Sequence, residues 1–142
     1  MTIVDISKEL LQHIKTSVQA DYPYETCGFL IGTQARAGIQ VQDAIQASNL
    51  NRERPQARYE LDPRALLTAD RAAQDRGLEI VGIWHSHPDH PACPSETDRA
   101  AAWEGWSYMI LSVTPHGVTE IRSWRLADDK FVEEKIYHHD PC

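Results

Sequence analysis

The stretch Leu78-Glu79-Ile80-Val81-Gly82-Ile83-Trp84-His85-Ser86-His87-Pro88 decides the fold. Its apolar residues are nearly continuous from Leu78 to Trp84, which is typical of a strand that is buried on both faces. The strand runs directly into His85-Ser86-His87-Pro88. Because open α/β sheets place their ligands at the carboxyl ends of strands, we expect the chemistry of the protein at this point.

The two histidines have a spacing that suits one metal ion. Side chains two residues apart on a strand point to the same face and lie about 6–7 Å apart, so His85 and His87 can converge on a metal while Ser86 points away. The pattern is not specific by itself. Two surface histidines before a turn proline are an equally simple interpretation of it.

Asp98 is the candidate third ligand. It lies eleven residues beyond His87, at the start of a predicted helix over Ser95–Glu104. Two imidazoles and one carboxylate leave a fourth position open for water. An alternative is that Ser95-Glu96-Thr97-Asp98 only forms a helix N-terminus, with Ser95 as the cap. The two roles are compatible, because capping would hold both side chains rigidly at the mouth of a site.

The rest of the chain predicts helices beside a mixed sheet. One helix begins at Ser7 and ends near Pro23, and another begins at Asp62-Pro63 and ends at Gly77. Further strands are expected at Cys27–Thr33, Gly38–Ala47, Tyr59–Leu61, Ser107–Val113, Val118–Leu126 and Phe131–Tyr137. The polar segment Ser48–Arg58 is expected to be a surface loop.

The predicted fold class is therefore α/β, of the α+β type: a single-domain mixed β-sheet flanked by helices. The expected domain covers residues 1–137, and residues 138–142 are expected to form a short C-terminal tail. A chain of 142 residues has the length of one domain, so a separate cofactor module is not expected.

Composition and charge exclude several classes of function. The net charge is −7 and no basic block occurs, so a nucleic-acid partner is not expected. No apolar run approaches the roughly 20 residues that span a bilayer, so a membrane partner is not expected either. The three cysteines, Cys27, Cys93 and Cys142, are odd in number and widely spaced, which indicates reduced thiols. With no secretory signal at the start, we expect a cytoplasmic protein.

These residues together resemble a known family. His85-Ser86-His87-Pro88, followed after six residues by Ser95-x-x-Asp98 and preceded by Glu25 before Cys27-Gly28, is similar to the JAMM (MPN+) metallopeptidases. The resemblance implies a JAMM/MPN fold, similar to cytidine-deaminase-like architecture. It also implies that His85, His87 and Asp98 bind Zn²⁺, that Ser95 hydrogen-bonds the oxygen of the tetrahedral intermediate, and that Glu25 shuttles the proton. Without the resemblance, Glu25 would be an ordinary solvated loop carboxylate.

The implied substrate comes from the resemblance alone. The segments Tyr24–Gly28 and Arg58–Pro63 are similar to compact bacterial members that hydrolyse the bond between the C-terminal glycine of a ubiquitin-like sulfur carrier and cysteine. The implied partner is a ubiquitin-like sulfur carrier protein with a Gly-Gly C-terminus, and the implied process is cysteine biosynthesis. Alternatives are a peptidase on another ubiquitin-like conjugate or a cell-wall peptide, and a catalytically silent scaffold. The intact set of five residues counts against the scaffold.

Other residues that could carry chemistry are not assigned to the site. His90 and Cys93 are interpreted as loop positions, and Cys27 as a small buried residue. The aromatic pair Trp103 and Trp106 is interpreted as core. Arg52, Arg54 and Arg58 form a basic loop that could face an acidic carrier, although solvation is the simpler interpretation.

Overall fold

The structure is a computed structural model in which residues 2–49, 59 and 61–140 are described. The elements in chain order are β1 (Ile3–Ser7), α1 (Lys8–Asp21), β2 (Cys27–Ala35), β3 (Gly38–Ala47), α2 (Pro63–Asp75), β4 (Glu79–Pro88), α3 (Glu96–Ala101), β5 (Ser107–Thr114), β6 (Gly117–Ala127) and β7 (Lys130–His139). In this described part of the chain, no helix is long and apolar enough to cross a membrane.

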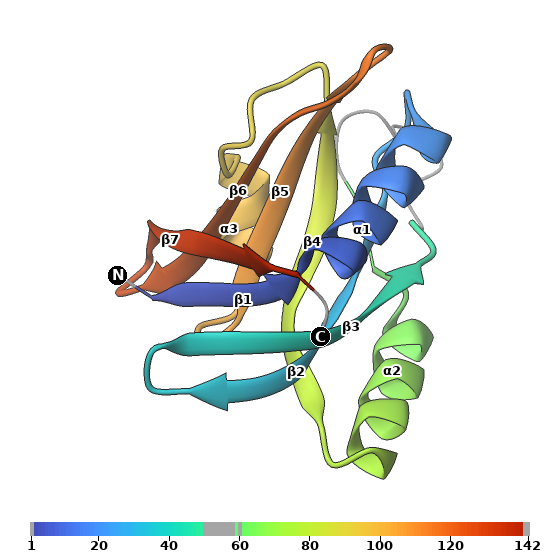
Figure 1. Ribbon diagram of the computed structural model, residues 1–142. Helices are drawn as coiled ribbons and strands as arrows, with labels where there is room; N and C mark the ends of the chain where they lie inside the picture. Colours follow the sequence, from blue (N-terminus) through green and yellow to red (C-terminus); the bar gives the residue numbers. More distant parts are fainter. Residues whose placement is uncertain (1, 50–58, 60, 141–142) are drawn as a thin grey trace.

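The strands form a closed barrel rather than an open sheet (Figure 1). Their order around the barrel is β1-β3-β2-β4-β5-β6-β7. The predicted combination of helices and a mixed sheet is confirmed, and the closure of that sheet into a barrel is a feature that the sequence analysis did not predict. Closure comes from β1, which pairs in parallel with β3 on one side and with β7 on the other. The sequence prediction did not include this strand.

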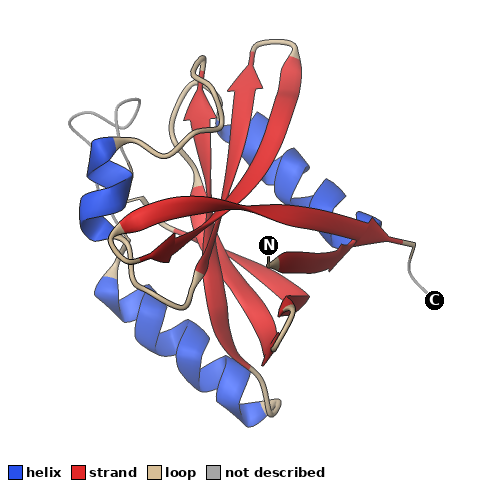
Figure 2. Cartoon of the chain, turned by 90° about the vertical axis from the view of Figure 1, so that its left-hand side faces the viewer, coloured by secondary structure: helices blue, strands red, loops and turns tan. Residues whose placement is uncertain are grey.

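Helices α1 and α2 pack against opposite faces of the strands (Figure 2). Ser7 caps α1 by accepting the N–H of Leu10, as the sequence predicts. The buried positions of α1, Leu11, Ile14 and Val18, belong to one core cluster together with Trp84, Met109 and Leu111 of β4 and β5. The buried alanines of α2, Ala69 and Ala73, belong to a second cluster with Phe29, Ile83 and Tyr108. The central strands β4 and β5 therefore have core on both sides.

The antiparallel pairing of β2 with β4 brings distant parts of the chain together. Cys27 pairs with His85 and Gly28 with Trp84, so the start of β2 lies beside the end of β4. Gly28 is required there by close approach, because a Cβ atom would lie 2.4 Å from the Trp84 ring and 2.2 Å from the carbonyl oxygen of Ile45. This register positions the site described below.

Several boundaries differ from the sequence prediction. Strand β4 continues through His85–Pro88, so both histidines lie in the strand itself. Strand β7 continues through His138 and His139, which pair with Ile6 and Ser7 of β1, so these two residues are not part of a loose tail. Helix α3 ends at Ala101 instead of Glu104.

Of the strand expected at Tyr59–Leu61, Leu61 forms an isolated bridge with Asn49 and Glu60 lies outside the described residues. Most of the loop expected at Ser48–Arg58, including its three arginines, also lies outside them.

Candidate metal centre and active site

The end of β4 presents two imidazoles on one face of the sheet. His85 is completely buried and His87 is partly buried, and their ring centroids lie 5.1 Å apart. Ser86 lies between them in the sequence, and its hydroxyl accepts the N–H of Thr26, the residue just before β2, at 2.8 Å. The alternation of a strand thus separates the two imidazoles from the hydroxyl that anchors the neighbouring segment.

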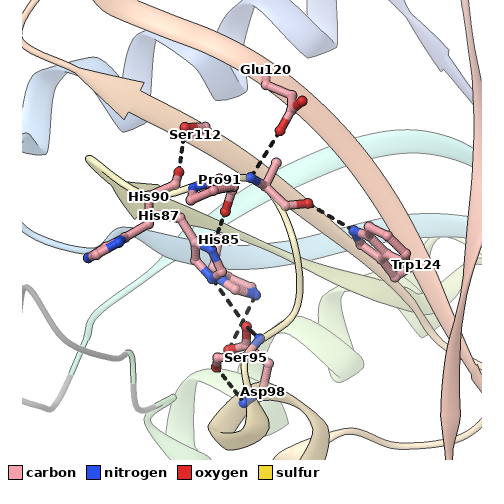
Figure 3. Close-up of polar contacts among 10 residues, drawn as sticks. His85, His87, His90, Pro91, Ser95, Asp98, Ser112, Glu120 and Trp124 are labelled. Atoms are coloured by element: carbon pink, nitrogen blue, oxygen red, sulfur yellow. Dashed lines mark hydrogen bonds and ion pairs between the residues drawn. The ribbon is translucent and has the colours of Figure 1, made fainter.

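Asp98 meets both imidazoles from the start of α3 (Figure 3). Its Oδ2 lies 3.1 Å from Nε2 of His87, and its Oδ1 lies 3.8 Å from Nε2 of His85. The same carboxylate accepts the N–H of Ser95 at 2.8 Å, while the Ser95 hydroxyl accepts the N–H of Asp98 at 3.0 Å. This capping box holds Asp98 rigidly where it faces the histidines, so the capping role is confirmed and the carboxylate still lies beside both imidazoles.

Glu25 approaches the same point from the segment before β2. Its side chain is 6% exposed, and Asn49 donates to its backbone carbonyl at 3.2 Å. Ligand atoms of Glu25, His85 and His87 lie within 4.8 Å of one another. The hydrogen bonds between Thr26 and Ser86 fix the backbone next to Glu25, and continuing the Cys27–His85 register by two residues sets Glu25 opposite His87. The pairing of strands therefore joins residues that are sixty positions apart.

The acid–base properties of the cluster follow from burial and from its own charges. Burial alone would raise the pKa of Asp98, but the hydrogen bond from His87 and the charge of His85 lower that pKa to about 2. Burial would likewise lower the pKa of His87, but its hydrogen bonds to Asp98 and to the Pro91 carbonyl raise it. Burial raises the pKa of Glu25 to about 8, against the opposing effect of His87 and with a further increase from Asp98.

His85 is the clearest sign that the cluster fits a cation. Burial lowers the pKa of its imidazole to about 4, so the ring is neutral and carries a lone pair for a metal. Within the described residues, neither ring nitrogen of His85 nor Oε2 of Glu25 has a hydrogen-bond partner. Buried polar atoms are normally satisfied, so three unpaired atoms within one cluster fit a site that binds a ligand. Two imidazole nitrogens and a charged carboxylate form a donor set that suits Zn²⁺ and other first-row metals.

A cavity of about 360 Å³ gives access to the cluster. Its walls include Glu25, His87, Ser95 and Asp98. The Ser95 hydroxyl already accepts the N–H of Asp98, and no acceptor for its own proton is found in the described part of the chain. Its O–H is therefore free to donate to a molecule in the cavity.

Comparison with known proteins identifies the family of this chain. A domain family described as prokaryotic homologs of the JAB domain matches residues 7–127. The chain belongs to this family. The JAMM resemblance seen in the sequence is thereby confirmed.

Known relatives match this chain over nearly its whole length. It is 37% identical over 134 residues to the desampylase of Haloferax volcanii, which covers 93% of this chain and 91% of that protein. It is 32% identical over 136 residues to the CysO-cysteine peptidase of Mycobacterium tuberculosis, which covers 94% of this chain and 90% of that protein. A solved structure of a protein from Desulfitobacterium hafniense matches with a TM-score of 0.86 at 28% identity, over 97% of this chain and 94% of that one.

Sequence reasoning missed several residues that shape this JAB-domain site. The Tyr59 ring lies 4.4 Å from the His85 ring and covers it, although Tyr59 was predicted only as part of a short strand. His90 and Cys93, interpreted as plain loop positions, both line the cavity. The Pro91 carbonyl accepts a hydrogen bond from Nδ1 of His87. No sequence signal could have found that contact, because every residue carries a carbonyl.

Proposed function

We propose that this protein is a zinc-dependent hydrolase that cleaves the amide bond after the C-terminal glycine of a ubiquitin-like sulfur carrier protein and releases cysteine. The observation that carries the proposal is the unpaired, fully buried His85 ring, which faces Asp98 and lies beside His87 and Glu25. The other three side chains line one cavity. Without a ligand, the unpaired nitrogens of the buried His85 ring would lower the free energy of unfolding with nothing to compensate for it.

We assign His85, His87 and Asp98 as the residues that would hold the metal. Asp98 is preferred to Glu25 as the carboxylate ligand because its two backbone contacts fix its position and its low pKa keeps it charged. Bound zinc would supply Lewis-acid polarisation of the carbonyl and would lower the pKa of water to about 7. Glu25 then remains for proton transfer.

Glu25 and Ser95 would divide the remaining tasks. Glu25 has an unpaired Oε2 and a raised pKa of about 8 in the metal-free protein, which suits a group that takes a proton from the attacking water and returns it to the leaving amine. The free O–H of Ser95 can donate to the carbonyl oxygen as negative charge develops on it. Each carboxylate thus has one task, and the difference between their pKa values supports the division.

A second candidate substrate is a conjugate in which the carrier is joined to another protein. It is favoured by the 37% identity to a protein named desampylase, against 32% to the protein named CysO-cysteine peptidase. Both substrates share a scissile amide, so the same residues would serve either. We also propose that the metallopeptidase domain extends beyond the expected boundary at residue 137 to the end of β7 at His139, and that the protein works in the cytoplasm, where Cys27 and Cys93 would stay as free thiols.

The two candidates are separated by direct assay. Zinc-loaded protein is incubated with a carrier–cysteine adduct, with a carrier joined to a lysine side chain, and with a short unrelated peptide, and the products are measured by mass spectrometry. We expect loss of cysteine from the first adduct. Cleavage of only the lysine conjugate would favour the second candidate, and cleavage of only the short peptide would reject both.

A further inference from the structure

Side chains of strand β6, among them Glu120 and Trp124, hold the loop over residues 89–94, which lies between the histidines and α3 (Figure 3). The Glu120 carboxylate accepts the N–H of Ala92 at 3.1 Å. The indole N–H of Trp124 donates to the carbonyl of the same residue at 3.0 Å. Ala92 is completely buried, so its backbone groups need partners inside the protein. Both partners come from β6.

One peptide unit connects Glu120 to a candidate metal ligand. The carbonyl of Pro91 lies 2.8 Å from Nδ1 of His87 and can only accept a hydrogen bond, so Nδ1 carries the proton. This carbonyl and the N–H of Ala92 belong to the same planar peptide group. The C=O and the N–H lie within this rigid plane and point in opposite directions. The hydrogen bond from the Ala92 N–H to Glu120 therefore also fixes the direction of the Pro91 carbonyl.

We infer that Glu120 is a positioning residue for His87, acting through the Pro91–Ala92 peptide. It holds the imidazole in the orientation that directs Nε2 toward Asp98, where a metal would bind. Trp124 supports this arrangement by holding the next peptide group. The inference rests on the proposed function, since it takes His87 to be a metal ligand.

The chemistry of the link gives Glu120 an effect beyond geometry. A charged acceptor on the Ala92 N–H polarises the peptide and makes the Pro91 carbonyl a stronger acceptor. A stronger acceptor at Nδ1 makes Nε2 of His87 more basic toward a metal, as a carboxylate does in direct contact with a metal-bound histidine. Such partners typically change metal affinity by 10–100-fold. Glu120 is exposed, so solvent weakens the effect and we expect the lower end of that range.

The first test measures zinc affinity by competition with a chelator. Glu120→Ala removes the acceptor at the protein surface and should weaken zinc binding about 10-fold. Glu120→Gln keeps an amide oxygen that accepts the same N–H, so its affinity should stay within about twofold of wild type. Glu104→Ala, which removes an exposed carboxylate elsewhere in the chain, is the matched control and should leave the affinity unchanged.

The second test reads the hydrogen bond itself. In the zinc-loaded protein, the NMR signal of the His87 Nδ1 proton should exchange slowly with water in the wild type and in Glu120→Gln. It should exchange faster in Glu120→Ala and in Trp124→Phe, which keeps the ring beside Arg122 but loses the indole N–H. Unchanged zinc affinity and unchanged exchange in Glu120→Ala would overturn the inference. Failure of the wild-type protein to bind zinc would instead overturn the proposed function, so the two failures are distinguishable.

Discussion

Replacing Glu25 by Gln separates the role of this carboxyl from that of the ligands. The pKa of Glu25 is raised from 4.5 to about 8, chiefly by burial, and the side chain is 6% exposed. Between these two pH values the folded metal-free protein keeps a proton that the unfolded chain releases. Its stability therefore falls as pH rises through this window. One pKa unit corresponds to about 1.36 kcal/mol, so the wild type should lose about 3 kcal/mol from this group between pH 5 and pH 8.

Glu25→Gln has no proton to lose and should escape this decrease. Denaturant unfolding of the metal-free proteins at pH 5 and pH 8 measures the effect, with Glu79→Gln, an exposed position on β4, as the control that should follow the wild type. With zinc restored, the Gln variant should keep the metal and lose about 10²–10⁴ in turnover. The same pH dependence in wild type and Glu25→Gln would refute the argument that this carboxyl is buried in its neutral form. Loss of zinc from the variant would show that Glu25 is a ligand.

Other substitutions and conditions test the remaining parts of the site and the core. His87→Ala and Asp98→Asn should each weaken zinc binding at least about 100-fold in a chelator competition, and retention of full affinity by both would contradict the ligand assignment. Zinc affinity should also fall as the pH drops through the raised pKa of His87, because protons compete with the metal for that ring. Zinc titrations at several pH values measure this effect. A zinc affinity that does not change with pH would count against it. Ser86→Ala leaves the buried N–H of Thr26, the residue next to Glu25, without an acceptor. This variant should lower kcat about 10-fold at unchanged zinc content. Loss of zinc would instead indicate a general disruption of β4. Ile14→Ala, in the fully buried face of α1, should cost about 2–5 kcal/mol of unfolding free energy and leave zinc affinity alone.

Local signals in the sequence were sufficient to predict most of the fold. The continuous apolar run before His85 predicted the central strand, and Ser7, Asp62 and Pro63 predicted the starts of two helices because capping depends on neighbouring residues only. Strand β1 was missed because its short alternating pattern merges with the start of α1. Without it, barrel closure could not be predicted, since closure depends on pairing between the two ends of the chain.

The candidate site divides in the same way. His85 and His87 follow from spacing within one strand, and Asp98 from its place at a helix start. Glu25 could be suggested only through a family resemblance, because its position depends on the register of β2 against β4. The contacts that orient His87 could not be predicted at all, since they involve a backbone carbonyl and side chains of β6.

The most direct measurement is anomalous diffraction at the zinc edge from crystals grown with zinc. The account predicts one strong peak about 2.0–2.2 Å from Nε2 of His85, Nε2 of His87 and a carboxylate oxygen of Asp98. A peak bound elsewhere, or zinc held by the two imidazoles while Asp98 faces away, would contradict it.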